Sequence, residues 1–150
     1  MEIDIEVNNI TQSPVKDDFF AMVAQKTIET SGYDFLQAKK IAISVALVSE
    51  KEMQKLNREH RQKDSVTDIL SFCEYENAGE IEKSNEVELF LGELILCYDD
   101  ISKYALEQDI DLAEELANVV SHGVLHLLGF EHGEKMFGIQ KQVIGLIKNI

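Results

Sequence analysis

The sequence is poor in residues that cross-link or stiffen a chain, and it has no segment that could anchor it in a membrane. It contains one proline, two cysteines and no tryptophan. No apolar run reaches the roughly 18 residues needed to cross a bilayer. The first residues, MEIDIEV, alternate charged and apolar side chains instead of following the basic-then-apolar order of a secretion signal. We therefore expect a soluble, cytoplasmic protein with no membrane partner.

The two cysteines do not indicate a disulfide or a cysteine-bound metal site. Cys73 and Cys97 are far apart in the sequence and lack the Cys-x-x-Cys spacing that is typical of metal sites. In a cytosolic protein, cysteines of this kind are normally reduced. We interpret both as core thiols and expect no disulfide partner.

Positive charge is also scarce. The sequence has 14 Lys and Arg residues against 28 Asp and Glu residues, a net charge of −14 at pH 7. This balance argues against broad electrostatic adhesion to nucleic acid. A bound divalent cation with a few basic side chains can still make an attractive cleft on an acidic protein. Arg58 and Arg61, flanked by Lys55 and Lys63, form one local basic cluster, although a solvated helix end is its ordinary explanation.

Apolar periodicity predicts an α+β (α/β) protein with about four strands. Alternating or continuous apolar runs indicate strands at residues 3–7, 41–48, 67–72 and 88–97. Patterns of helical period, with their capping signals, indicate helices over residues 13–32, from residue 50, from residue 99 or 100, over 112–128 and over 134–147. We expect a small mixed sheet packed by these helices, within a single domain that spans residues 1–150.

Two local details of this pattern can be checked against the structure. Ser13-Pro14 is expected to open the first helix, because serine caps free backbone N–H groups and proline suits the first helical position. The acidic segment 74–88 has few apolar residues to bury, so we expect an exposed, mobile loop there.

The most informative segment is HGVLHLLGFEH, residues 122–132, which holds three of the four histidines. His122 and His126 are four residues apart on the predicted helix 112–128, so their rings lie on one face and can share an ion. Gly129 allows the sharp turn that can bring His132 back to the same point. Three nitrogen ligands leave a fourth position on zinc for water, the arrangement of catalytic zinc sites.

The same spacing also occurs in the metzincin peptidases, H-x-x-x-H-x-x-G-x-x-H. In those enzymes a glutamate follows the first histidine and acts as general base, whereas Gly123 stands there in this chain. A glycine cannot accept a proton from water. The sequence therefore has the metal ligands without the peptidase base in its usual place.

The segment 122–132 resembles the motif H-G-x-L-H-L-x-G-[YF]-D-H of the YbeY-type endoribonucleases, a family of ribosomal RNA maturation factors. The matching positions are His122, Gly123, Leu125, His126, Leu127, Gly129, Phe130 and His132. Three further segments are similar to family motifs and follow in family order: LNREHR at 56–61, TDILSF at 67–72 and LGELIL at 91–96. The chain departs from the family pattern at Val66 and Cys73, where proline is usual, and at Glu131, where aspartate is usual.

The resemblance implies one zinc ion per chain, bound by His122, His126 and His132, and a catalytic or phosphate-binding role for Arg61. It further implies a small α/β fold and a single-strand-specific endoribonuclease that acts in maturation of the 16S rRNA 3′ end and in ribosome quality control. Small-subunit rRNA and the ribosome or its proteins would be its partners.

The residues suit this chemistry. Zinc can acidify a bound water or neutralise a phosphate oxygen, and the planar fork of Arg61 can pair two phosphate oxygens. Glu131 is the candidate proton carrier or the partner of a metal ligand.

Two other functions stay open at this point. One is a metzincin-like metallopeptidase that uses a displaced base such as Glu131. The other is a noncatalytic, ribosome-associated zinc-binding factor, which the charge of −14 favours because an acidic surface suits a basic ribosomal protein. Arg61 discriminates between these functions, since a structural metal site has no need of a phosphate-binding arginine.

Overall fold

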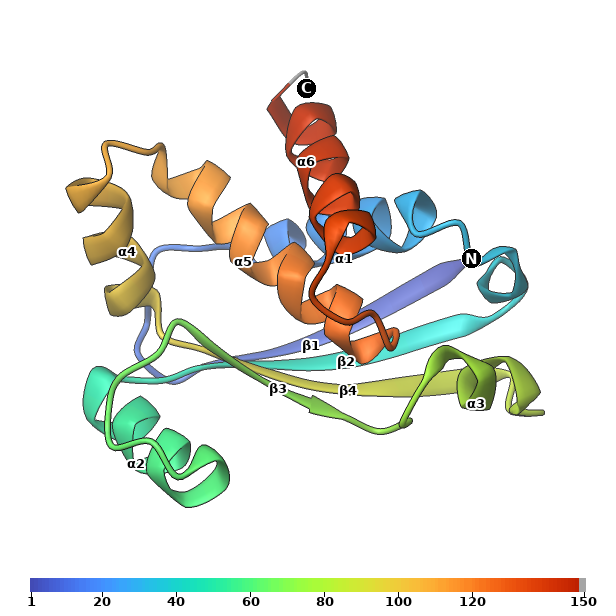
Figure 1. The fold of residues 1–150 in the computed structure, drawn as a ribbon, viewed down its shortest axis with the longest axis horizontal. Coiled ribbons are helices and arrows are strands. Elements are labelled where there is room, and N and C mark those ends of the chain that lie inside the picture. Colours follow the sequence, from blue (N-terminus) through green and yellow to red (C-terminus); the bar gives the residue numbers. More distant parts are fainter. Residues whose placement is uncertain (149–150) are drawn as a thin grey trace.

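The computed structural model describes residues 1–148 and has a four-stranded mixed sheet with helices on both of its faces (Figure 1). The strands are β1 (Glu2–Asn9), β2 (Lys40–Leu47), β3 (Ile69–Cys73) and β4 (Glu88–Leu96), in the order β1-β2-β4-β3. β1, β2 and β4 run parallel, and β3 pairs antiparallel with β4 at the edge. The expected mixed sheet of about four strands is confirmed.

Six α-helices surround the sheet in the described part of the chain. They are α1 (Asp17–Thr30), α2 (Glu50–Arg61), α3 (Ala78–Lys83), α4 (Tyr98–Glu107), α5 (Leu112–Leu127) and α6 (Glu134–Lys148), with a short 3-10 turn, η1, at Asp34–Leu36. Figure 1 shows α1, α5 and α6 on one face and α2 on the other. None of the helices in residues 1–148 is long and apolar enough to cross a membrane.

The core lies between the sheet and the layer of α1, α5 and α6. Alternate residues of β2 are buried, Ile41, Ile43, Val45 and Leu47, which is the period-two pattern of a strand with one face in the core. They pack with buried residues of α1 and α5 in one large cluster. A smaller cluster on the opposite face, around Met53 and Leu70, holds α2 against the sheet.

The capping signal at Ser49 is confirmed, because its side chain accepts a hydrogen bond from the backbone N–H of Glu52 at 3.2 Å. The start expected at Ser13-Pro14 is wrong. The Asn9 side chain closes a turn onto the backbone of Ser13, through bonds of 2.9 Å in both directions. Ser13 is therefore held in that turn, and α1 begins at Asp17.

The segment 74–88 is mostly exposed, as expected, but the expectation that it is a loop throughout is wrong. The segment contains α3, whose first turn is capped by the side chain of Asn77, which accepts from Glu80 N at 3.0 Å. Ile81 is only 1% exposed and joins the main core. The Asn77 cap and the burial of Ile81 both stabilise this short helix, and composition alone does not reveal either contact.

Candidate active site

α5 is the element that positions the site, and it packs unusually close to the sheet. A Cβ atom on Gly123 would lie 2.6 Å from Ile69 Cδ1 and 2.8 Å from Leu94 Cδ2. A side chain at this position would therefore push the helix away from β3 and β4. The place where a metzincin peptidase carries its base faces the core in this chain and admits no glutamate.

His122 and His126 lie on α5, and His132 lies in the loop between α5 and α6. Gly129 makes the turn that the sequence predicted, with φ +93°. A Cβ atom there would also lie 2.8 Å from the backbone nitrogen of Ala78, so glycine is required by space as well as by conformation. The turn returns the chain and brings His132 beside the two helical histidines.

The three Nε2 atoms converge on one point. They are separated by 3.1 Å between His122 and His126, 3.1 Å between His122 and His132, and 3.0 Å between His126 and His132. These distances are close to the separation of about 3.3 Å expected for two nitrogens that each lie about 2.0–2.1 Å from a tetrahedral zinc ion. The three histidines can therefore hold one metal ion.

Hydrogen bonds on the opposite ring atoms show which form the histidines take. His126 Nδ1 lies 3.2 Å from the carbonyl oxygen of Phe130, which can only accept, so Nδ1 carries the hydrogen. His122 Nδ1 donates in the same way to Gln140 Oε1 at 3.2 Å. In a neutral imidazole the Nε2 atom then presents a lone pair, and lone pairs 3.1 Å apart repel one another. A cation between them removes the repulsion, so these residues fit a metal ion.

Gln140 is a site residue that sequence reasoning missed. It is buried on α6, and its Nε2 donates to Asn118 Oδ1 at 3.1 Å and, at 3.4 Å, to the backbone oxygen of the same residue. That leaves Oε1 as the atom that faces His122. A signal was present in the sequence, because Gln140 interrupts an apolar stripe of Met136, Ile139 and Val143, and a buried amide needs hydrogen-bond partners.

The environment of His122 and His126 favours their neutral forms. Burial lowers the pKa of His122 and of His126 below the ordinary histidine value, and the neighbouring histidine rings lower the pKa of His126 further. A neutral imidazole is the form that binds a metal. The site therefore favours its metal-binding state without help from a nearby carboxylate.

Arg61 lies in the same cleft as the three histidines, a cavity of about 780 Å³. It is the last residue of α2, because Gln62 takes a left-handed conformation with φ +58° and ends the helix. Its Nη2 donates to the carbonyl oxygen of Ser71 at 3.0 Å, and its guanidinium lies over the ring of Phe72. These contacts hold the side chain at the rim of the cleft.

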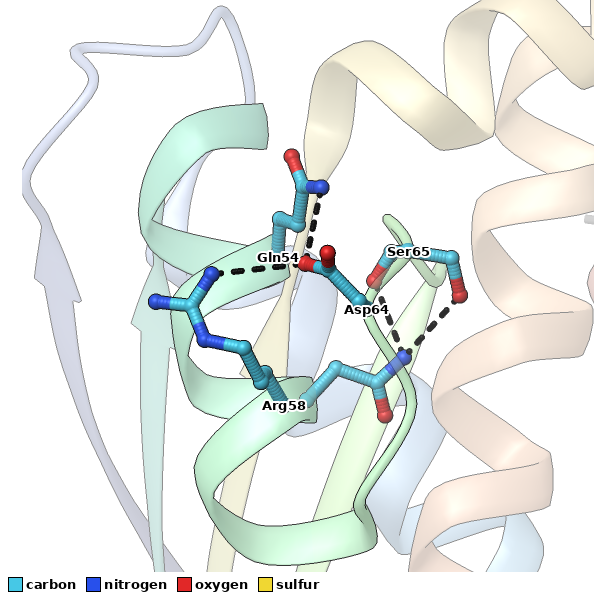
Figure 2. A network of polar contacts seen from close by, with 5 residues as sticks. Gln54, Arg58, Asp64 and Ser65 are labelled. Carbon is cyan, nitrogen blue, oxygen red and sulfur yellow. Dashed lines mark hydrogen bonds and ion pairs between the residues drawn. The ribbon is translucent and has the colours of Figure 1, made fainter.

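The neighbouring arginine has a different environment. Arg58 forms an ion pair with Asp64 at 3.3 Å, and Gln54 donates to the same carboxylate (Figure 2). No ion pair of Arg61 occurs within residues 1–148. The basic cluster noted in the sequence thus divides into one arginine that fastens the loop after α2 and one whose charge faces the cleft.

The loop after α2 depends on another residue that the sequence reasoning passed over. Asn57 is buried, and its side-chain amide donates to the backbone oxygen of Ser65 at 2.9 Å. This bond ties the end of α2 to the segment that leads into β3. Asn57 therefore helps to fix the position of Arg61.

The structure also places further residues that the sequence analysis singled out. Glu131 is exposed and is not among the side chains that line the cavity; Asp68 and Glu115 are the carboxylates that line it. Cys97 is a buried free thiol as expected, but Cys73 is exposed, so its assignment to the core is wrong. Cys73 ends the edge strand β3 and lines the cleft, where its thiol donates to the carbonyl oxygen of His126 at 3.3 Å.

Comparison with known proteins agrees with this geometry. The family model described as Endoribonuclease YbeY matches residues 6–147. Proteins of that name from Oceanobacillus iheyensis and Staphylococcus carnosus are 33% and 37% identical to this chain, over 94% and 68% of its length and 95% and 69% of theirs.

A Thermotoga maritima protein solved in solution has a similar fold, with a TM-score of 0.61 and 24% identity over 97% of this chain and 93% of its own. The match of the family model across nearly the whole chain, together with these relatives, decides the assignment. The chain belongs to the endoribonuclease YbeY family.

Proposed function

We propose that residues 1–150 form one zinc-dependent, single-strand-specific endoribonuclease domain that acts in the cytoplasm. Its substrate is small-subunit rRNA, its task is maturation of the 16S rRNA 3′ end and ribosome quality control, and it works in contact with the ribosome. The observation that carries the proposal is the placing of three converging Nε2 atoms and Arg61 in one cleft. The names of the relatives supply the RNA substrate.

The metal ligands prepare the site for zinc. Three imidazole nitrogens suit this ion and leave one position open. When bound, the ion supplies Lewis acidity to a phosphate oxygen and lowers the pKa of a coordinated water. The chain's own contribution is to hold His122 and His126 with Nε2 facing inward, through the hydrogen bonds at Nδ1.

Arg61 supplies the second half of the proposed chemistry. Its guanidinium stays charged at any working pH, and its fork can pair two oxygens of the phosphodiester as negative charge grows in the transition state. The carbonyl oxygens of Ser71 and His60 each accept one hydrogen bond from Arg61, which leaves other N–H groups of its guanidinium free for a phosphate. Glu131 remains the candidate proton carrier, a role that Glu131→Gln tests through the cleavage rate.

The observations weigh against the two other functions. A peptidase lacks its usual base here, since Gly123 faces Ile69 and Leu94. A purely structural metal site would not need an arginine without an ion-pair partner in its cleft. A phosphodiester substrate gives a role to the three histidines and to Arg61, the four residues that this cleft brings together.

The decisive experiment is RNA cleavage by protein purified without a metal-binding tag. We expect about one zinc ion per chain by elemental analysis, cleavage of unstructured RNA, loss of cleavage with chelator, and recovery when zinc is returned. Casein digestion without RNA cleavage would indicate the peptidase, and a zinc-loaded protein that cleaves neither would indicate the noncatalytic factor.

The products define the route of attack. A 2′,3′-cyclic phosphate identifies attack by the neighbouring 2′-hydroxyl, in which the bond to the 5′-oxygen breaks. Cleavage that survives replacement of this hydroxyl by hydrogen identifies attack by water.

A further inference from the structure

Phe137 is an aromatic side chain that the metal chemistry does not use. It lies in the first turn of α6 and is 52% exposed, whereas the neighbouring apolar residues Met136 and Ile139 are buried. Its ring lies nearly parallel to that of the metal ligand His132, with an angle of 28° and a centroid distance of 6.1 Å. Phe137 thus lies beside one of the three clustered histidines while about half of its surface remains exposed.

The charge of the protein makes such a face useful to an RNA-binding site. A chain of net charge −14 gains little from broad attraction to phosphates. The basic side chains that line the cleft are Arg61 and Lys63. Stacking of a base on an aromatic ring needs no positive charge and contributes about 1–3 kcal/mol per base. In this protein it can replace part of the missing electrostatic affinity.

A second exposed aromatic residue, Tyr104 on α4, provides a comparison. It is 49% exposed and lines a cavity next to the metal cleft. Asp68 and Glu115 line both cavities, but this one adds Asp100 and Glu107, and its Lys103 is already paired with Glu50. A phosphate backbone would be repelled there, so the RNA strand is expected to pass Phe137 and not Tyr104.

We propose that Phe137 is a stacking platform for an unpaired nucleobase of the RNA, next to the phosphate held at the metal site. The inference rests on the proposed function for the position of that phosphate. A base inside a duplex has both faces covered by its neighbours, so only a single-stranded or extruded base can use the platform. The platform therefore gives a physical cause for a preference for single-stranded RNA.

Binding and cleavage are measured separately to test this. The binding probe is a short, unstructured 2′-O-methyl RNA that carries the fluorescent base 2-aminopurine and has no free 2′-hydroxyl to attack the neighbouring phosphate. Phe137→Ala should weaken binding by at least about fivefold, the lower end of what one stacked base contributes. Phe137→Tyr should restore binding, and Phe137→Leu, which is apolar but has no ring, should not. Tyr104→Ala is the matched control and should bind like wild type.

Two further readouts separate stacking from packing. Zinc content should be the same in wild type and Phe137→Ala. A set of probes, each lacking one base, should include one probe that wild type and Phe137→Ala bind equally. In that probe the base that stacks on Phe137 is missing, so the ring no longer contributes to binding. A loss of zinc in Phe137→Ala, rescue by leucine, or equal effects at Phe137 and Tyr104 would each overturn the proposal.

Failure of the proposed function leaves a different signature. If the protein binds the probe through Phe137 but wild type cleaves no RNA, the catalytic proposal fails and the platform stands. If wild type cleaves RNA, and Phe137→Ala cleaves RNA and binds the probe as well as wild type does, the platform fails and the catalytic proposal stands.

Discussion

The metal cleft and the acidic cavity beside it share one wall but differ in chemistry. Asp68, Glu115 and Val119 line both. The cleft, of about 780 Å³, adds three histidines and Arg61 to that wall. The cavity, of about 370 Å³, adds Asp100 and Glu107, and its Lys103 is already paired with Glu50 at 2.6 Å.

The pKa values of the titratable groups shift in opposite directions in the two regions. Burial lowers the pKa of His122 and His126, which keeps these ligands neutral and ready for a cation. On the other side, burial raises the pKa of Asp100 and Glu115, and the charge of Asp68 raises both further. The geometry of one region can accept a cation, whereas the other region brings several carboxylates close together. The difference shows how an acidic protein can limit its attraction for a polyanion to one place.

The largest effect should follow from removing a metal ligand. His126→Ala leaves two nitrogens, so we expect loss of bound zinc and of detectable cleavage, because several kcal/mol of transition-state stabilisation goes with the ion. His60→Ala, at the exposed histidine outside the cluster, is the control and should retain zinc. Elemental analysis and cleavage rates check both. Full zinc occupancy in His126→Ala would show that the ion is held elsewhere.

The next effect separates the two arginines of α2. Arg61→Ala should keep its fold and zinc but cleave RNA about a hundredfold more slowly or worse, on the order of 3 kcal/mol. Arg61→Lys should have an intermediate rate, because lysine keeps the charge and loses the two-pronged geometry. Arg58→Ala should lose little activity, since Arg58 pairs with Asp64. Wild-type cleavage by Arg61→Ala would remove this residue from the mechanism.

A smaller effect concerns the residue that orients His122. Gln140→Leu removes the acceptor of the Nδ1 hydrogen, and we expect zinc affinity to fall by about 10–100-fold. Gln142→Leu, an exposed position on the same helix, should leave zinc affinity unchanged. Competition with a chromophoric chelator measures both. Equal affinity in the two variants would make the Gln140 contact incidental to metal binding.

The smallest expected effect is on the stability of the protein, and it concerns Glu115, which lines both cavities. Because the pKa of Glu115 is raised, the folded protein holds this proton more readily than the unfolded chain. Stability from this group is therefore present below the unfolded pKa of about 4.3 and is lost as the pH rises through the folded pKa. Glu115→Gln should raise the melting temperature modestly at neutral pH and give no gain near pH 4. A gain that does not vary with pH would contradict the electrostatic explanation.

Much of this architecture could be predicted because its determinants are local. The alternation in β1, the continuous apolar run of β2 and the capping residue Ser49 each act within a few residues of their effect. The predictions failed where a contact with a residue outside the local segment determines the structure. α3 exists because Ile81 finds a place in the core, and α1 starts late because Asn9 holds Ser13.

The candidate site divides in the same way. The spacing of His122, His126 and His132, with Gly129 at the bend, is written in consecutive residues, and the helix period turns that spacing into a metal site. The sequence also placed Arg61 in a recognisable motif. It could not show that Arg58 would pair with Asp64 while Arg61 lines the cleft with the histidines, because that depends on where the loop after α2 brings Asp64.

By itself, then, the sequence determined most of the elements, the three candidate metal ligands and the resemblance to the family, since each depends on patterns along the chain. Only the tertiary structure decided that Gln140 on α6 would orient His122, that Cys73 would line the cleft, and that Phe137 would lie beside His132. The physical reason is that these relations join segments on different elements. Their distances are set by how α5, α6 and β3 pack, and no local pattern encodes that packing.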